Sequence, residues 1–470
     1  MRSPSAARAA EILFTRRQML RAMGAAGLGA AATIGAGCQV IKGTDPLPSG
    51  SLAKPPAPDR KRVIEIYNIW GAPTGSGWVQ LAQRYERTHP DVGVRVTFAP
   101  TSATGAGQPK LFAAIAANDP PDLAQIVPFQ TPQFAALGVM TDLTPYFKRS
   151  GLSGDDFFAP AWNDMNWKDR IWQMQWDADP NFPFFWNKDL FEASGLDPDR
   201  PPRTIDEVDA ASQKIIKRSG ANVVKIGMIP WDTYGPSNSA VTWGWAFGAS
   251  FYDQDRGEVT PDNDLAVKAL EWMAGYAASV GGASRVAVSP PTITLAPFGT
   301  GNVGMAGLVA PNWADVRKAK PNMHVGATLL PFQPPGASKP GDAAWFGGWS
   351  MFIPKGAKNP DDAWEFLKWV CTDDGGTAAQ WETIGFPPAY KRSPTIQRMK
   401  NDPVMAPFYP TLVNAQHARP SMEVSDFYAA QLDVYVQKAV FGEIKPLQAM
   451  QTVKELTMNE LERFQRELAV

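Results

Sequence analysis

The stretch VIEIYNIWGAPTGSGWVQLAQRYERTHPDVGVRVTF, residues 63–98, contains a strand pattern, a helix pattern and a second strand pattern in succession. The apolar run at 63–67 predicts a strand, and a Gly-rich turn follows it. The amphipathic helix that comes next has an apolar face comprising Trp78, Leu81, Ala82 and Tyr85. Alternating apolar residues from Val92 to Phe98 predict the second strand. This order is typical of α/β layers around a mostly parallel sheet.

The same alternation continues toward the C-terminus. The expected elements are a helix at 110–117, a strand at 122–127, a helix at 205–218 that Thr204 caps, a strand at 224–229, a helix at 265–278, an apolar run at 303–309 and helices across 427–468. Ligands of such sheets bind beyond the carboxyl ends of the strands. We therefore expect Asn68, Trp70, Phe129 and Gln130 to lie near a binding crevice.

The N-terminus has the features of an export signal. Arg16 and Arg17 precede an Ala/Gly run at 22–37, which is too short and too weakly apolar to be a stable membrane span. Residues 34–38 resemble a lipoprotein cleavage box, although Gly35 stands where Leu is usual. Residues 1–38 are therefore predicted to be a twin-arginine (Tat-type) lipoprotein signal in which Cys38 is lipidated. An ordinary signal with an incidental cysteine is the alternative.

Residues 39–60 are rich in Pro, Ser, Lys and Gly, and we expect them to be a tether between the anchor and the folded body. The 470 residues carry a formal net charge of −1, with no basic surplus to hold nucleic acid. Only Cys371 remains if Cys38 is lipidated, so no disulfide is expected within the chain. The helical spacing around Cys371 predicts a buried core residue.

Motifs for catalysis and metal binding are weak. Residues 299–304 fit the letters of a dinucleotide-binding glycine motif, but no helix pattern follows them, so a tight turn is the better interpretation. His89, His324 and His417 occur singly, without the spacing of metal ligands. We expect no cofactor, no metal and no catalytic triad.

Three segments together resemble family 1 of the extracellular solute-binding proteins. FFWNKDLFEASGLDPDRPPRTIDEVDAASQKI (184–215) is similar to the crossover segment of that family, and FGTGNVGMAGLVAPNW (298–313) and FGGWSMFIPKGAKNPDDAWEFLKWVCT (346–372) are similar to two later stretches. The resemblance spans about 63–468, and the segments occur in the order of the family. The family includes maltose-binding protein.

The resemblance implies a two-lobed periplasmic-binding-protein-like α/β fold of type II, whose discontinuous lobes are joined by crossover strands. One lobe would comprise 60–184 plus 323–385, and the other 188–320 plus 386–470. It further implies a monomeric solute-binding subunit of an ABC importer, anchored by lipid on the outer face of the cytoplasmic membrane. Such a protein closes around a carbohydrate and then docks on the transmembrane permease subunits.

Aromatic residues in loops are candidates for ligand contact. IPWDTYGPSNSAVTWGWAFGASFYD (229–253) places Trp231 and Tyr234 in a loop, and flat rings there offer apolar faces to sugar C–H groups. Packing onto their own lobe is the alternative. Trp349 follows two glycines that leave room for a ligand. The full set of predicted ligand-binding residues is Trp70, Gln130, Trp176, Asp177, Trp231, Tyr234, Asn312, Trp313 and Trp349.

Two other functions stay open. Asp177 and Asp179 alternate on one face, as an acid and a nucleophile or base of a secreted carbohydrate-active enzyme could. A binding protein for a non-sugar polyol or a glycerophosphate is the second alternative, and it requires cationic residues in the cleft. Carbohydrate binding without catalysis remains the preferred prediction.

Overall fold

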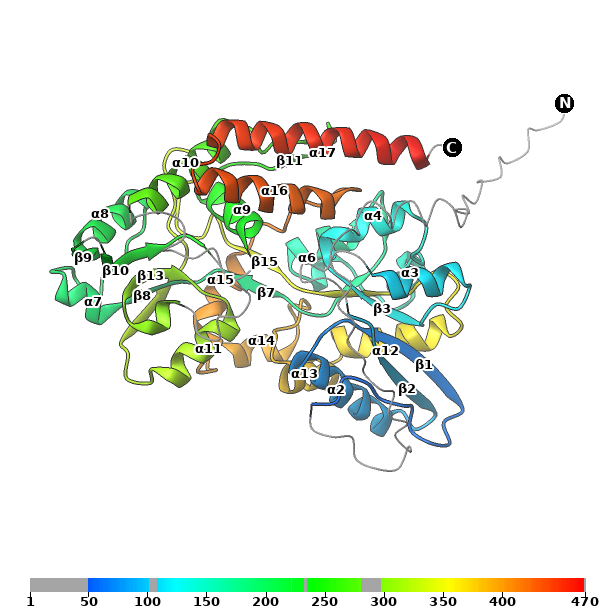
Figure 1. Ribbon diagram of the computed structural model, residues 1–470. Coiled ribbons are helices and arrows are strands. Elements are labelled where there is room, and N and C mark those ends of the chain that lie inside the picture. Colours follow the sequence, from blue (N-terminus) through cyan, green and yellow to red (C-terminus); the bar gives the residue numbers. More distant parts are fainter. Residues whose placement is uncertain are drawn as a thin grey trace.

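The computed structural model describes residues 50–100, 108–220, 222–231, 235–254, 256–279 and 297–468. Two mixed sheets, each covered by helices, form two lobes (Figure 1). The first sheet has the order β2 (Val92–Phe98), β1 (Arg62–Asn68), β3 (Leu123–Ile126), β16 (Ser350–Phe352) and β6 (Met174–Gln175). The second has the order β14 (Val325–Thr328), β8 (Phe184–Asn187), β13 (Val303–Gly307), β10 (Asn222–Ile229) and β9 (Lys217–Ser219). The predicted two-lobed α/β fold is confirmed.

The first lobe begins with the strand, helix and strand that the opening stretch predicts. Strand β1 pairs in parallel with both β2 and β3. Helix α2 (Thr74–Thr88) connects β1 to β2 and buries the apolar face predicted from its spacing. Further helices of this lobe are α3 (Pro109–Ala116), α4 (Thr131–Ala136), α5 (Thr144–Arg149), α6 (Ala159–Met165), α12 (Pro360–Thr372) and α13 (Asp374–Ile384).

The second lobe contains the helix that Thr204 caps. The Thr204 hydroxyl accepts a hydrogen bond from the Glu207 amide at 3.2 Å, and the Glu207 side chain reciprocates. This helix, α8 (Ile205–Ile215), ends earlier than predicted because Lys217–Ser219 folds back as β9 and pairs antiparallel with β10. Further helices are α7 (Lys188–Ala193), α9 (Pro236–Ala246), α10 (Asp264–Ser279) and α11 (Ala310–Ala319).

Two short strands cross between the lobes. Strand β7 (Asp179–Asn181) pairs antiparallel with β15 (Trp345–Gly347), and the pair lies between the two sheets in Figure 1. The chain thus returns to the first lobe at β15, since β14 still pairs with β8 in the second sheet. The predicted boundary at 323 therefore lies too early in the chain.

The boundary predicted at 386 also lies too early. The Pro387 carbonyl accepts from the Ala178 amide at 2.8 Å, and the Lys391 amide donates to the Asp156 carbonyl at 2.9 Å. These bonds hold α14 (Pro394–Met399) on the first lobe. The chain reaches the second lobe again near α15 (Tyr409–Asn414), which contacts β7 and β15.

Helices α16 (Ser425–Val440) and α17 (Pro446–Leu468) form a C-terminal hairpin that extends along both lobes (Figure 1). They pack on α9 and α10 of the second lobe, while Phe464 of α17 packs against the first lobe. The predicted helices across 427–468 are confirmed. Within the described residues, no helix is long and apolar enough to cross a membrane.

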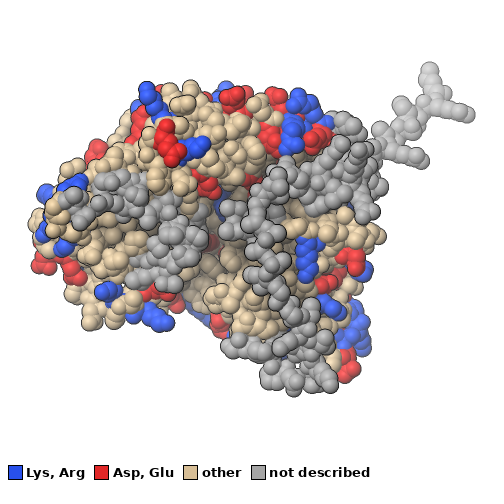
Figure 2. Space-filling model, viewed as in Figure 1, with Lys and Arg blue, Asp and Glu red and all other residues tan. Residues whose placement is uncertain are grey.

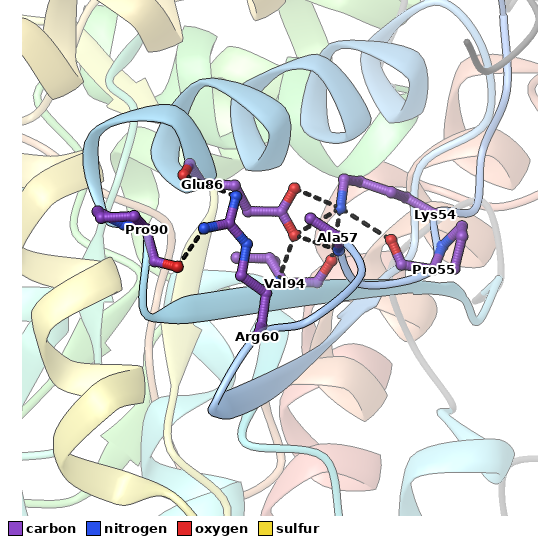
Figure 3. Close-up of polar contacts among 7 residues, drawn as sticks. All are labelled: Lys54, Pro55, Ala57, Arg60, Glu86, Pro90 and Val94. Carbon is purple, nitrogen blue, oxygen red and sulfur yellow. Dashed lines mark hydrogen bonds and ion pairs between the residues drawn. The ribbon is translucent and has the colours of Figure 1, made fainter. Parts of the chain in front are cut away.

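The end of the predicted tether belongs to the first lobe. Lys54 bridges to Val96, and its buried ammonium donates to Glu86 Oε1 at 2.7 Å and to the Val94 carbonyl at 3.0 Å (Figure 3). The same Glu86 oxygen accepts from the amides of Ala57 and Val94 at 2.9 and 2.8 Å. Burial lowers the pKa of Lys54, and Glu86 opposes that change. The body therefore begins at about Lys54 rather than after residue 60.

Candidate functional site

Trp70 and Trp349 form an aromatic pair at the base of the first lobe. Trp70 lies just beyond the carboxyl end of β1, and Trp349 lies between the crossing strand β15 and β16. Their ring centroids are 4.5 Å apart and the planes meet at 71°, an edge-on contact. Both side chains are half-buried. Each ring therefore keeps surface available to a ligand.

Polar side chains hold the main chain beneath Trp70. The Trp70 amide donates to Asn68 Oδ1 at 3.1 Å, and the Ile69 amide donates to Gln125 Oε1 at 3.0 Å. Asn68 and Gln125 are fully buried at the ends of β1 and β3. The chain thus leaves β1 on a fixed path that presents the Trp70 ring.

Asp177 holds the main chain beneath Trp349. The Trp349 amide donates a hydrogen bond to Asp177 Oδ1, and the Trp349 carbonyl accepts from the Trp176 amide at 3.0 Å. The Asp177 side chain is 0% exposed. Burial raises the pKa of Asp177 well above its usual range and nearby Asp179 adds to the rise, while the hydrogen bond from Trp349 opposes it.

Gly348 is required by this packing. Its φ of +123° is one that side chains rarely adopt, and a Cβ there would lie 2.4 Å from the Asp177 carbonyl oxygen. From the sequence, the two glycines before Trp349 are predicted to leave room for a ligand. At Gly348 the space is instead occupied by Asp177.

Several polar atoms around the pair are buried without a hydrogen-bond partner. They include Trp70 Nε1, Gln125 Nε2, Gln175 Oε1 and Ser350 Oγ. Buried polar groups without partners are uncommon in folded proteins, because each one costs free energy. Their concentration beside two half-open indole rings is typical of a site that receives a polar molecule. Gln175 and Ser350 are members of this cluster that the sequence analysis missed, since neither occupies a loop.

Gln130 contacts the other lobe. Its Nε2 lies 2.7 and 2.8 Å from the two carboxylate oxygens of Asp426 on α16, and its Oε1 accepts from the Val127 amide at 3.2 Å. Burial raises the pKa of Asp426 to about 6, and the bond from Gln130 opposes the rise. Gln130 therefore braces the two lobes, whereas the sequence analysis assigned it to the ligand.

Trp176 and Trp313 are buried in the lobes. Trp176 is fully buried and meets Trp78 edge-on at 5.0 Å. Trp313 is 5% exposed and packs on Phe185 with ring centroids 4.7 Å apart, both within the second lobe. An open stacking surface is absent at either ring, because both side chains are buried.

The remaining predicted residues are dispersed. Trp231 follows β10 and is buried beside Trp243 in the second lobe, and Asn312 is half-buried on α11. Tyr234 and Cys38 lie outside the described residues. Among the described residues, the structure thus brings together Trp70, Trp176, Asp177 and Trp349, whereas Trp231, Asn312 and Trp313 belong to the second lobe.

The surface is hollowed where the two lobes meet (Figure 2). Arg419, which the sequence analysis did not identify, lies over the Phe129 ring at 4.4 Å in a small cavity between η1 (Pro128–Gln130), α9 and α16. The free volume of that cavity, ≈ 20 Å³, has room for about one water. It is too small for a sugar.

Two lobes joined by crossing strands, with aromatic and polar side chains at their base, define a protein of the type that binds a ligand between its lobes. The model of the bacterial extracellular solute-binding protein family matches residues 70–377. The chain belongs to this family.

Solved structures support the same fold. A mannobiose-bound protein designated CpMnBP1 is 26% identical, with a TM-score of 0.70, and the match covers 84% of this chain and 99% of that one. The maltose-bound MalE3 of T. maritima is 21% identical, with a TM-score of 0.67 over 85% of this chain and all of that chain. A "Probable amino-acid ABC transporter periplasmic-binding protein" of Sinorhizobium fredii is 25% identical over 45% of this chain. The match spans about half (48%) of that curated relative.

Proposed function

We propose that the protein captures a carbohydrate between its lobes and delivers it to the transmembrane subunits of an ABC importer. The observation that carries the proposal is the half-open Trp70–Trp349 pair beside buried polar atoms without partners. Indole faces accept the C–H groups of a sugar ring, and polar atoms nearby bond its hydroxyls. The likeness to a mannobiose-bound protein supports a carbohydrate ligand.

The charged groups around Arg419 make an anionic ligand such as a glycerophosphate less favourable than a neutral sugar. Burial raises the pKa of Asp164, Asp426 and Asp433, and the positive charge of Arg419 opposes that rise in each carboxyl. Arg419 is thus already placed among carboxylates. A phosphate would compete with these acidic groups for the guanidinium.

The structure also favours binding over the alternative in which Asp177 and Asp179 hydrolyse a glycoside. One oxygen of Asp177 accepts the Trp349 amide, and the whole side chain is buried beneath the main chain of that residue. A general acid or nucleophile must reach the glycosidic bond. We therefore propose that the protein releases its sugar unchanged.

A thermal-shift screen tests the proposed ligand class. The probes are mannobiose, maltose, tagatose, free amino acids and glycerol 3-phosphate, each well above its expected Kd. A sugar at 100 times its Kd should stabilise the fold by about 2.7 kcal/mol. Small-angle scattering should then show a smaller radius of gyration with that sugar, because the lobes close. Stabilisation by amino acids or glycerol phosphate alone would contradict the carbohydrate proposal.

We also propose that Cys38 carries a lipid that holds the protein on the outer face of the membrane. Cys38→Ser should therefore move the protein from the membrane fraction to the soluble fraction without changing its melting temperature. Cell fractionation with a salt wash measures this. If the variant stays in the membrane fraction after the wash, another element anchors the protein.

A further inference from the structure

The Trp349 main chain is held at a place where the regular strand pairing has ended. Strands β16 and β6 pair antiparallel through Ser350 opposite Gln175, and the Trp176 amide still reaches the Trp349 carbonyl. One residue further, Gly348 turns the chain with a φ of +123°. A strand partner for the Trp349 amide is therefore replaced by the Asp177 side chain.

We propose that Asp177 is a positioning residue: its carboxyl fixes the Trp349 main chain so that the Trp349 ring stands against Trp70 in the binding site. This inference rests on the proposed function, because the ring pair is the surface assigned to the sugar. Asp177 thus acts on the ligand through Trp349. This indirect role replaces the direct contact between Asp177 and the ligand that the sequence predicts.

The surroundings of Asp177 support this role. Its side chain is fully buried, and the Gly348 Cα leaves so little room that a Cβ there would lie 2.9 Å from Asp177 Oδ1. Gln175 Nε2 donates to the Asp177 carbonyl at 2.8 Å and to the Gly347 carbonyl at 2.9 Å, which ties the two segments together. Asp177 Oδ1 thus lies against Gly348 and the Trp349 amide.

The free-energy cost of burying the Asp177 carboxyl also supports a positioning role. Its second oxygen, Oδ2, is buried without a partner, and burial raises the pKa of the carboxyl. A small apolar residue would remove that cost but would leave the Trp349 amide without an acceptor. On the other side of the pair, Asn68 accepts the Trp70 amide in the same manner. In each tryptophan of the pair, the main-chain amide therefore donates to a buried side-chain oxygen, which fixes the position of the ring.

A double-mutant cycle tests the inference. Asp177→Leu removes the acceptor, Asp177→Asn keeps one, and Trp349→Ala removes the ring through which Asp177 acts. Titration calorimetry with the sugar found in the screen should show about a tenfold loss for Asp177→Leu and a loss within about threefold for Asp177→Asn. In the Trp349→Ala background, Asp177→Leu should change the affinity by less than about twofold. Equal losses in both backgrounds would overturn the positioning role.

A measurement without ligand separates this inference from the proposed function. The near-ultraviolet circular dichroism of the Trp70–Trp349 pair should change in Asp177→Leu as it does in Trp349→Ala, and Asp177→Asn should keep the wild-type spectrum. Asp177→Ala serves in place of Asp177→Leu if the larger side chain prevents folding. If the wild type binds no carbohydrate, the proposed function fails and the spectra still decide the positioning role. A wild-type spectrum in the folded Leu or Ala variant would refute it.

Discussion

Glu86→Ala is expected to lower the free energy of unfolding by about 3–5 kcal/mol, because it leaves a buried cation without its partner. Lys54 is 5% exposed, and its ammonium lies 2.7 Å from the Glu86 carboxylate. The substitution also takes the acceptor away from the amides of Ala57 and Val94. Urea unfolding followed by circular dichroism measures the loss.

Two controls define the cause of that loss. The double variant Lys54→Met/Glu86→Gln removes both charges but keeps a side-chain oxygen for the two amides, so it should recover most of the stability. Asp91→Ala breaks the exposed pair with Lys61 and should cost less than about 1 kcal/mol. A Glu86→Ala loss as small as that of Asp91→Ala would show that Lys54 finds water when its partner is removed.

The buried Lys54–Glu86 pair could not be predicted from the sequence. Residues 39–60 have the composition of a tether, and composition carries no information about a partner 32 residues away. Helix α2 was predictable because its apolar residues recur at the period of the helix itself. Lys54 lies in no such period. Its burial follows from Glu86 and Val94, which helix α2 and strand β2 bring together.

The binding site was predictable in part for the same reason. Trp70 lies just after a strand whose apolar run ends at residue 67, so its place near the crevice follows from the pattern. Trp313 also lies beyond a strand, and it is one of the predicted ligand-binding residues. Whether such a ring faces the ligand or the core depends on tertiary neighbours, and Phe185 provides a core neighbour for Trp313. No local pattern indicates that contact.

Trp349→Ala should weaken sugar binding by at least about 30-fold, which corresponds to the loss of more than 2 kcal/mol typical of a central aromatic contact. Its effect on the melting temperature should be modest, because the ring is half-buried and its edge contact is with Trp70. Trp70→Ala should behave in the same way. Titration calorimetry and a melting curve on each variant separate the two effects.

Trp364→Ala is the matched contrast, since it removes the same side chain from the interior of the first lobe. Trp364 is fully buried, meets Phe147 at 5.3 Å and donates to Ser150 Oγ at 3.1 Å. Its loss should cost about 3–5 kcal/mol of stability and leave the affinity of the folded fraction within about twofold. Trp313→Ala should follow Trp364→Ala, because its ring packs on Phe185. If Trp313→Ala instead binds as weakly as Trp349→Ala and melts like the wild type, the Trp313 ring contacts the sugar and its assignment to the core of the second lobe is wrong.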